Sequence, residues 1–240
     1  MRSRTLAHAK ASGGVQHQAP KRPVHTLITE MDGTMLPMVT TKTGPGLDGR
    51  KAKQLFWREA RLCLARPLDA VDAVYGATFG TAQVAALLWR EVGETAGLGP
   101  QSRVHGLGDG ATWIVNNFQE ELLSGADSQA TYTVDFHHVS DYLAAAAKVV
   151  APERNKDWLH QQQGWLRQNC VSEVLRALAP HLEPEQPGQE EEEKGPVRSA
   201  HGYISERKQY LNYAGALAEG LPIGSGEVEE GGTDTSCKSV

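Results

Sequence analysis

The chain has 240 residues, of which 40% are hydrophobic and 22% are charged, and its formal net charge at pH 7 is −5. This composition is typical of one globular core with appendages, and no apolar run approaches the roughly 20 residues of a membrane helix. The acidic balance argues weakly against a nucleic-acid partner, because phosphate binding usually leaves a basic surface. Three cysteines, at 63, 170 and 237, form neither an even disulfide set nor a metal-binding pair, which favours a cytoplasmic location.

The N-terminal part begins with a basic segment, residues 1–24, that lacks the apolar stretch of a secretory signal. We expect it to be a disordered leader. Residues 25–41 predict a β-hairpin. Asp32-Gly33 is a turn signal, and Met35–Thr40 is expected to return as the second strand.

The next segments alternate between extended and helical patterns. Apolar and polar residues alternate enough at positions 57–64 to predict a third strand, although a helix is also compatible with this pattern. Residues 74–78 predict a short extended segment. Residues 81–97 predict an amphipathic helix, with apolar side chains recurring on one side.

The middle of the chain places two carboxylates directly after apolar strands. The strand expected at Val104–Leu107 leads to Asp109, and the strand expected at Tyr132–Val134 leads to Asp135. Between them, Val115–Leu123 has nearly helical spacing. A buried or edge carboxylate destabilises the fold unless it is paired, hydrogen-bonded or bound to a metal. Two of them in this segment therefore predict a functional site more than a stabilising role.

The second half predicts helices. Ser140 is expected to cap a helix through Val150, and residues 157–179 predict another helix. The acidic segment 183–198 is rich in glutamate and proline and predicts disorder. A last helix is expected at 205–217. The whole order predicts an α/β fold with a mixed sheet, flanking helices and an all-helical second half.

Three carboxylates lie where a metal-dependent phosphoryl-transfer site would need them, at Asp32, Asp109 and Glu229. Mg²⁺ prefers oxygen ligands, and two such ions can activate a nucleophile and stabilise a leaving oxygen. Taken alone, an Asp-Gly pair is more often a hairpin turn than a ligand. The adjacent histidines 137 and 138 lack further zinc ligands at a suitable spacing, and residues 224–226 do not fit a nucleotide-binding loop.

Four sequence blocks, taken in order, resemble bacterial insertion-sequence transposases of the ISKra type. They are Met-Asp-Gly-Thr at 31–34, Leu-Gly-Asp-Gly-Ala-x-Trp-Ile at 107–114, Val-Asp-Phe-x-His-Val-x-x-Tyr-Leu at 134–143 and Leu-Pro-Ile-Gly-Ser-Gly-x-Val-Glu at 221–229. Those transposases are DDE enzymes, related to the Mutator group, with an RNase H-like core. The resemblance covers roughly residues 25–230.

The resemblance implies roles for particular residues. Asp32, Asp109 and Glu229 match the catalytic, metal-binding acids, and the implied cofactor is Mg²⁺ or Mn²⁺. Asp135 and His138 match a supporting Asp-x-x-His block, and Trp113 belongs to the block around Asp109. The implied reaction is metal-dependent hydrolysis and strand transfer on the DNA of transposon ends.

The resemblance also implies a division of the chain. We expect a leader at 1–24, RNase H-like strands and helices at 25–138, a helical insertion at 139–218 and a glutamate segment with a short tail at 219–240. Relative to the family, the chain looks truncated at both ends, which predicts impaired activity.

Two other functions stay open. One is a non-catalytic derivative of the same fold that binds DNA or protein, and the other is an RNase H-like nuclease. No membrane partner is expected, and a homo-oligomer is left open.

Overall fold

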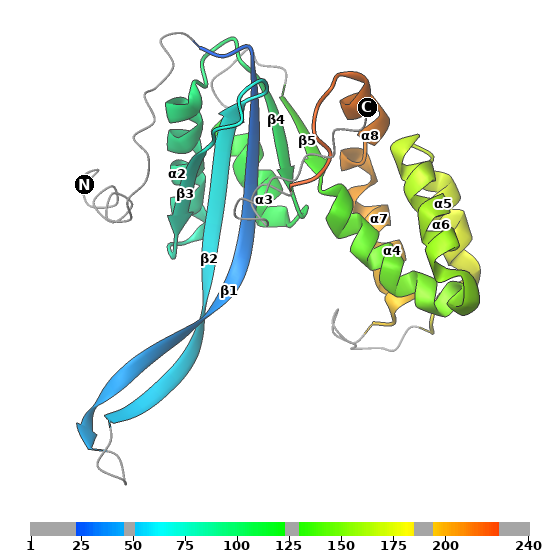
Figure 1. The fold of residues 1–240 in the computed structure, drawn as a ribbon, viewed down its shortest axis with the longest axis horizontal. Helices are drawn as coiled ribbons and strands as arrows, with labels where there is room; N and C mark the ends of the chain where they lie inside the picture. The colour runs from blue at the N-terminus through cyan, green and yellow to red at the C-terminus, as the bar shows by residue number, and fades with distance from the viewer. Residues whose placement is uncertain (1–22, 46–50, 123–129, 185–193, 226–240) are drawn as a thin grey trace, which may run out of the picture. The chain divides into compact units, whose positions relative to one another are not determined.

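A computed structural model describes residues 23–45, 51–122, 130–184 and 194–225. The protein is a mixed α/β protein with one five-stranded sheet, in the order β3-β2-β1-β4-β5, and flanking helices (Figure 1). The strands are β1 (Thr26–Pro45), β2 (Lys51–Pro67), β3 (Val74–Thr78), β4 (Arg103–Gly108) and β5 (Ala130–Val134). The helices are α2 (Ala82–Ala96), α3 (Thr112–Asn117), α4 (Phe136–Val150), α5 (Asn155–Arg167), α6 (Val171–Leu178), α7 (Pro196–Arg207) and α8 (Tyr213–Ala218).

The chain divides into two compact units. The first consists of residues 1–104 and 116–129, and the second consists of residues 105–115 and 130–240. The boundary falls inside β4.

The first unit is held together by α2, which packs on β2 and β3. The hydroxyl of Thr81 accepts a hydrogen bond from the backbone N of Val84, and Gly97 ends the helix with φ of 109°. Trp89 of α2 is fully buried, and its Nε1 donates to Oγ1 of Thr29 at 2.5 Å. The helix predicted at 81–97 is therefore confirmed.

The hairpin prediction places the turn wrongly. Asp32 and Gly33 lie inside β1, which continues to Pro45, and Met35–Thr40 does not return as a second strand. The partner is β2, antiparallel to β1 with Met31 opposite Cys63. An Asp-Gly pair is compatible with extended backbone, so long-range pairing outweighs the local turn preference. The third strand expected at 57–64 is part of β2, and the segment at 74–78 is β3.

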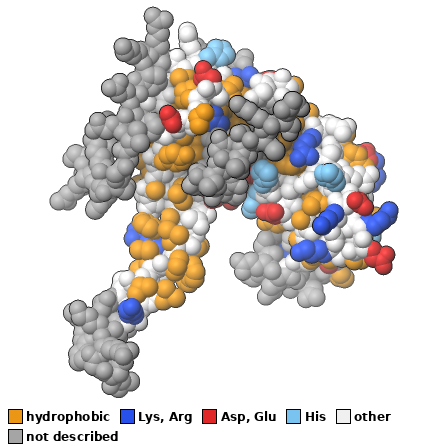
Figure 2. Space-filling model, in the orientation of Figure 1, with side chains coloured by type: hydrophobic (Ala, Val, Ile, Leu, Met, Phe, Trp, Pro, Cys, Tyr) orange, Lys and Arg blue, Asp and Glu red, His pale blue; other side chains and the backbone are white. Residues whose placement is uncertain are grey.

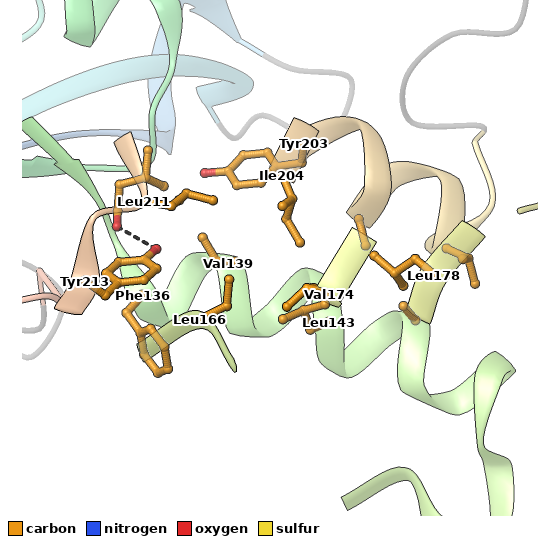
Figure 3. Close-up of a cluster of buried hydrophobic side chains, with 14 residues drawn as sticks. Phe136, Val139, Leu143, Leu166, Val174, Leu178, Tyr203, Ile204, Leu211 and Tyr213 are labelled. Atoms are coloured by element: carbon orange, nitrogen blue, oxygen red, sulfur yellow. Dashed lines mark hydrogen bonds between the residues drawn. The ribbon is translucent and has the colours of Figure 1, made fainter. Parts of the chain in front are cut away.

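The second unit is built on a cluster of buried side chains from α4 to α8 and the end of β5 (Figure 3). The cluster consists of Val134, Phe136, Val139, Leu143, Ala146, Leu166, Val174, Leu178, Val197, Ala200, Tyr203, Ile204, Leu211 and Tyr213. The Tyr213 hydroxyl donates to the carbonyl of Val134 at 2.9 Å, and this bond ties α8 to β5. The prediction that the second half of the chain is helical is therefore confirmed.

The helix boundaries in this unit differ from the predicted ones. The first helix, α4, is capped by Asp135 and not by Ser140, whose hydroxyl instead donates to the Phe136 carbonyl at 2.7 Å. The helix predicted at 157–179 breaks into α5 and α6 at Asn169, whose φ is 59°. Such a left-handed residue ends a helix because it turns the backbone out of the helical path.

The helix predicted at 205–217 is also two helices. The first, α7, begins at Pro196 and ends at Arg207, and α8 begins at Tyr213 after a short 3-10 turn. The Asn212 side chain accepts from the backbone N of Gly215 at 3.1 Å, which caps α8.

Part of the segment expected to be disordered, 183–198, is ordered. Glu183 binds the start of α7, where its carboxylate accepts from the backbone N of Val197 at 3.0 Å and of Arg198 at 2.7 Å. A carboxylate at a helix N-terminus is favourable because it pairs with free backbone N–H groups. Residues 185–193 lie outside the described residues.

Candidate functional site

Asp109 is the first residue after β4, as the sequence predicts. Its Oδ1 accepts a hydrogen bond from the backbone N of Ala111 at 2.8 Å, and the side chain is half-buried. Within the described residues, the second carboxylate oxygen accepts no hydrogen bond. Asp109 therefore has a fixed backbone position and one carboxylate oxygen free to bind a ligand.

Gly110, next to Asp109, has φ of +74°, a conformation that side chains with a Cβ rarely adopt. A Cβ there would lie 2.8 Å from Cγ2 of Val134 and 2.9 Å from Cδ of Arg207. We expect Gly110→Ala to lower the free energy of unfolding by about 2–4 kcal/mol, from backbone strain and overpacking together. Urea denaturation measures this loss.

The matched control for that substitution is Gly202→Ala in α7, where a Cβ meets no atom within 4 Å. It is expected to leave stability unchanged or to raise it by up to about 1 kcal/mol, since alanine favours a helix interior. Equal losses in both variants would show that Gly110 has no special packing role.

A cavity of about 320 Å³ lies beside Asp109 in the second unit. Its lining residues are Asp109, Ala111, His138, Tyr142, Tyr203, Glu206 and Arg207. His138 and Tyr142 lie one turn apart on α4, so they project from the same side of the helix. Within the part of the chain that the structure describes, the His138 ring nitrogens and the Tyr142 hydroxyl have no hydrogen-bond partner. The cavity thus offers several polar groups to a ligand.

Another part of the cavity lining comes from α7, whose Tyr203 and Arg207 are hydrogen-bonded to the backbone of Asp109 and Gly110. The Tyr203 hydroxyl donates to the Asp109 carbonyl, and Nε of Arg207 donates to the Gly110 carbonyl at 3.0 Å. Burial raises the pKa of Tyr203, so its hydroxyl stays protonated and keeps donating. These two bonds fix the loop that carries the Asp109 carboxylate.

The aromatic rings around the cavity pack closely. Tyr142 and Tyr203 stack with centroids 4.3 Å apart, and His138 meets both rings edge-on at 5.5 Å. The guanidinium of Arg207 lies 4.2 Å from the centroid of the Tyr203 ring. Tyr203 is therefore held between a ring and a cation, which gives this wall a defined shape.

Asp135 is buried and fully hydrogen-bonded. Its Oδ1 accepts from the backbone N of His137 at 2.6 Å, and its Oδ2 accepts from the backbone N of Ser225 at 3.0 Å and from the Ser225 hydroxyl. A Cβ at Gly224 would lie 2.6 Å from Cδ2 of His137, so only glycine allows this approach. Asp135 is thus a connector between the start of α4 and the segment 221–225.

His105 makes a second connection to the same segment. It is buried in β4, its Nε2 lies 2.8 Å from the Pro222 carbonyl oxygen, and its Nδ1 lies 3.0 Å from Oγ1 of Thr131. The backbone N of Phe136 also donates to the Ile223 carbonyl at 2.8 Å. Three of the sequence blocks, around Asp109, Asp135 and Ser225, are therefore joined in one unit.

The remaining predicted site residues are placed as follows. Asp32 lies in β1, in the first unit, and its Oδ1 accepts from the backbone N of Gly33 at 2.7 Å. Trp113 is half-buried in the first turn of α3. Glu229 lies outside the described residues. Within those residues, no three His, Cys, Asp or Glu side chains are grouped closely enough to hold a metal ion.

Sequence reasoning missed the contribution of α7, which supplies Tyr203, Glu206 and Arg207. A signal was present, because Pro196 is suited to the first position of a helix and the buried side chains at 197, 200 and 204 follow helical spacing. The acidic run before Pro196 masked this start.

The sequence matches no protein-family model, and no curated protein is significantly similar to it. In the ranges 23–45, 51–122, 130–184 and 194–225, no helix has both the length and the apolar character needed to cross a membrane.

Proposed function

We propose that this protein is the catalytic core of a DDE-type transposase that performs metal-dependent phosphoryl transfer on DNA. The observation that carries the proposal is the joining of three sequence blocks in the second unit. Asp135 binds Ser225, its backbone N donates to the Gly108 carbonyl at 2.8 Å, and Asp109 follows that glycine at the cavity. Blocks far apart in the sequence are expected to meet if they build one site.

The proposed fold is RNase H-like, with a helical insertion. An α/β sheet with flanking helices agrees with that proposal at the level of its architecture. In such a core the acids are delivered by strands, and Asp109 directly follows β4 while Asp32 lies within β1.

The Asp109 carboxylate fits a hard metal ion. It presents an oxygen without a hydrogen-bond partner in the described residues, on a cavity that a ligand can enter, and Mg²⁺ and Mn²⁺ favour carboxylate oxygens. Asp109 would hold the ion, and we propose Asp32 and Glu229 as the further ligands. When bound, the ion would stabilise negative charge on the oxygens of the reacting phosphate.

His138, Tyr142 and Arg207, the last also paired with Glu206 through Nη1 at 3.1 Å, would bind and orient the DNA. Arg207 has one terminal nitrogen without a hydrogen-bond partner among the described residues, and a guanidinium is well suited to a phosphate. His138 and Tyr142, which line the cavity, offer ring nitrogens and a hydroxyl as hydrogen-bonding groups. Asp135 acts only by positioning, since its carboxylate oxygens are already bonded.

Nicking of supercoiled plasmid DNA tests the proposal. With the full chain, we expect relaxed circles to form in Mn²⁺ or Mg²⁺ and not in a chelator, and a labelled oligonucleotide 3′ end to be joined to the plasmid. Cutting without joining would favour the RNase H-like nuclease. DNA binding in a gel-shift assay without any cutting would favour the non-catalytic derivative, and neither binding nor cutting would overturn the proposal.

A further inference from the structure

The strands β1 and β2 continue past β3 as a two-stranded ribbon. Residues 61–65 of β2 pair with β3, whereas residues 53–60 pair only with residues 34–41 of β1. We call this ribbon, residues 34–45 and 51–60, the arm (Figure 1). At about 3.3 Å per residue its uninterrupted pairing is roughly 25 Å long. An isolated two-stranded ribbon is marginally stable in water, so the arm is expected to gain stability from a partner.

Both faces of the arm carry exposed apolar side chains. Residues opposite each other in the pairing share a face, and successive residues of a strand alternate between the faces. The side chains that are between 38% and 59% exposed are Met35, Val39, Leu55 and Trp57 on one face and Leu36 and Phe56 on the other. The second face also carries Met38, which is half-buried opposite Phe56. Figure 2 shows the hydrophobic side chains that follow the arm. A flat partner could cover only one of these faces, so the arm is better suited to a groove.

The charges on the arm are positive over most of its length. In residues 34–45 and 51–58 there is no acid, and the cations are Lys42, Lys51, Lys53 and Arg58. The three lysines lie near the end of the ribbon that is far from β3. The connecting residues 46–50 add one acid and one base to the sequence, which leaves the balance unchanged. The whole chain has a net charge of −5, so the arm is a positive segment of an acidic protein.

The charged groups nearest to β3 already have partners. The Glu59 carboxylate is ion-paired with the guanidinium of Arg61, so it does not offset the charge of the lysines. Nη2 of Arg58 donates to the Phe79 carbonyl at 3.2 Å, and its guanidinium lies 4.8 Å from the centroid of the Phe79 ring. The lysines, more than Arg58, are therefore the cations that a partner of the arm would meet.

Charge and backbone geometry argue against two kinds of partner. Two arms packed on each other would bring their lysines together without an unpaired acid on either arm, and like charges repel. A lipid bilayer would leave the backbone groups along the open edges of the ribbon without hydrogen bonds. A polyanion with a groove meets both the charge and the apolar faces.

We propose that the arm binds duplex DNA and lies in the major groove, with its lysines at the phosphates and its apolar side chains at the base edges. The major groove, about 12 Å wide, admits a two-stranded ribbon, and apolar side chains contact thymine methyl groups there. At about 3.4 Å per base pair, a ribbon of roughly 25 Å follows about seven base pairs. Two-stranded ribbons twist strongly, so side chains of both faces reach the groove along its length. The choice of DNA among polyanions rests on the proposed function.

The first test measures binding of the full chain to a labelled DNA duplex by fluorescence anisotropy, in a chelator and over a range of salt concentrations. Lys53→Ala should weaken binding and reduce the slope of log affinity against log salt by about 0.9, because one phosphate contact is lost. Lys51→Ala combined with Lys53→Ala should reduce the slope by about twice as much. The control is Lys156→Ala, exposed on α5 and outside the cavity lining, which removes the same charge and should leave the slope unchanged.

The second test separates the apolar contact from the charge contact. Trp57→Ala should weaken DNA binding at least about fivefold while the salt slope stays the same, since a large apolar contact is lost and no phosphate contact changes. The matched control is Leu87→Ala on α2, because Leu87 is 60% exposed and Trp57 is 59% exposed. It should leave DNA affinity unchanged. Circular dichroism and thermal unfolding check that each variant is folded.

The inference is overturned if the full chain does not bind the duplex, or if Lys53→Ala and Trp57→Ala both bind it like the original protein. If these variants instead change the mass of the free chain in sedimentation equilibrium, the arm contacts a second copy. If they change only binding to anionic phospholipid vesicles, it contacts a membrane surface. Plasmid nicking reports on the proposed function separately. Nicking with DNA binding that does not depend on the arm contradicts the arm alone, and arm-dependent binding without nicking contradicts the catalytic proposal alone.

Discussion

Replacing Asp135 by alanine is expected to lower the free energy of unfolding by about 3 kcal/mol. The substitution removes the cap of α4 and leaves the backbone N of Ser225 and the Ser225 hydroxyl without their acceptor inside the protein. Loss of a helix cap costs about 1 kcal/mol, and a buried donor left unsatisfied costs about 1–3 kcal/mol. Urea denaturation followed by circular dichroism measures the change.

The control is Asp141→Ala, on the same helix but exposed. It should change stability by less than about 0.5 kcal/mol, because an exposed side chain outside a network contributes little. Similar losses in the two variants would mean that Asp135 does not connect α4 to the segment ending at Ser225.

Asp109→Asn is expected to reduce metal-dependent plasmid nicking about a hundredfold or more, while the fold is kept. Asparagine has nearly the same shape, and its carbonyl oxygen can still accept from the backbone N of Ala111. The change removes the charge that would hold the metal ion, and removing one group that stabilises a transition state typically costs a factor of 10²–10³. The readout is the initial rate of relaxed-circle formation.

Asp141→Asn serves as the control for this assay, since Asp141 lies outside the cavity lining. It should nick at the original rate. A full rate for Asp109→Asn would assign the nicking to a different site or to a contaminating nuclease.

The parts of the fold that follow from local sequence were predicted well. The helix α2 combines a Thr81 cap, an apolar side and a Gly97 end, and each of these signals acts over a few residues. In β1, by contrast, the local signal at Asp32-Gly33 favours a turn, whereas pairing with β2 over the whole strand keeps it extended. Strand pairing is a long-range property, and one sequence gives little information about it.

The same contrast between local and long-range signals applies to the candidate site. Each carboxylate was located because it follows an apolar strand, and both Asp109 and Asp135 do so. The two carboxylates differ in their long-range hydrogen bonds. Asp135 is bonded to Ser225, 90 residues later, whereas one carboxylate oxygen of Asp109 has no hydrogen-bond partner in the described residues. The pairing of α7 with the Asp109 loop through Tyr203 is equally distant in sequence and was not predicted.

Thermal unfolding with and without Mn²⁺ tests whether Asp109 is a metal ligand of the proposed phosphoryl-transfer site. A ligand that binds only the folded state raises the unfolding temperature, by an amount set by its affinity. We predict that Mn²⁺ raises the unfolding temperature of the original protein and of Asp141→Asn, and that this rise is lost in Asp109→Asn. An equal rise in Asp109→Asn would show that Mn²⁺ binds without the Asp109 carboxylate, so that Asp109 is not a metal ligand.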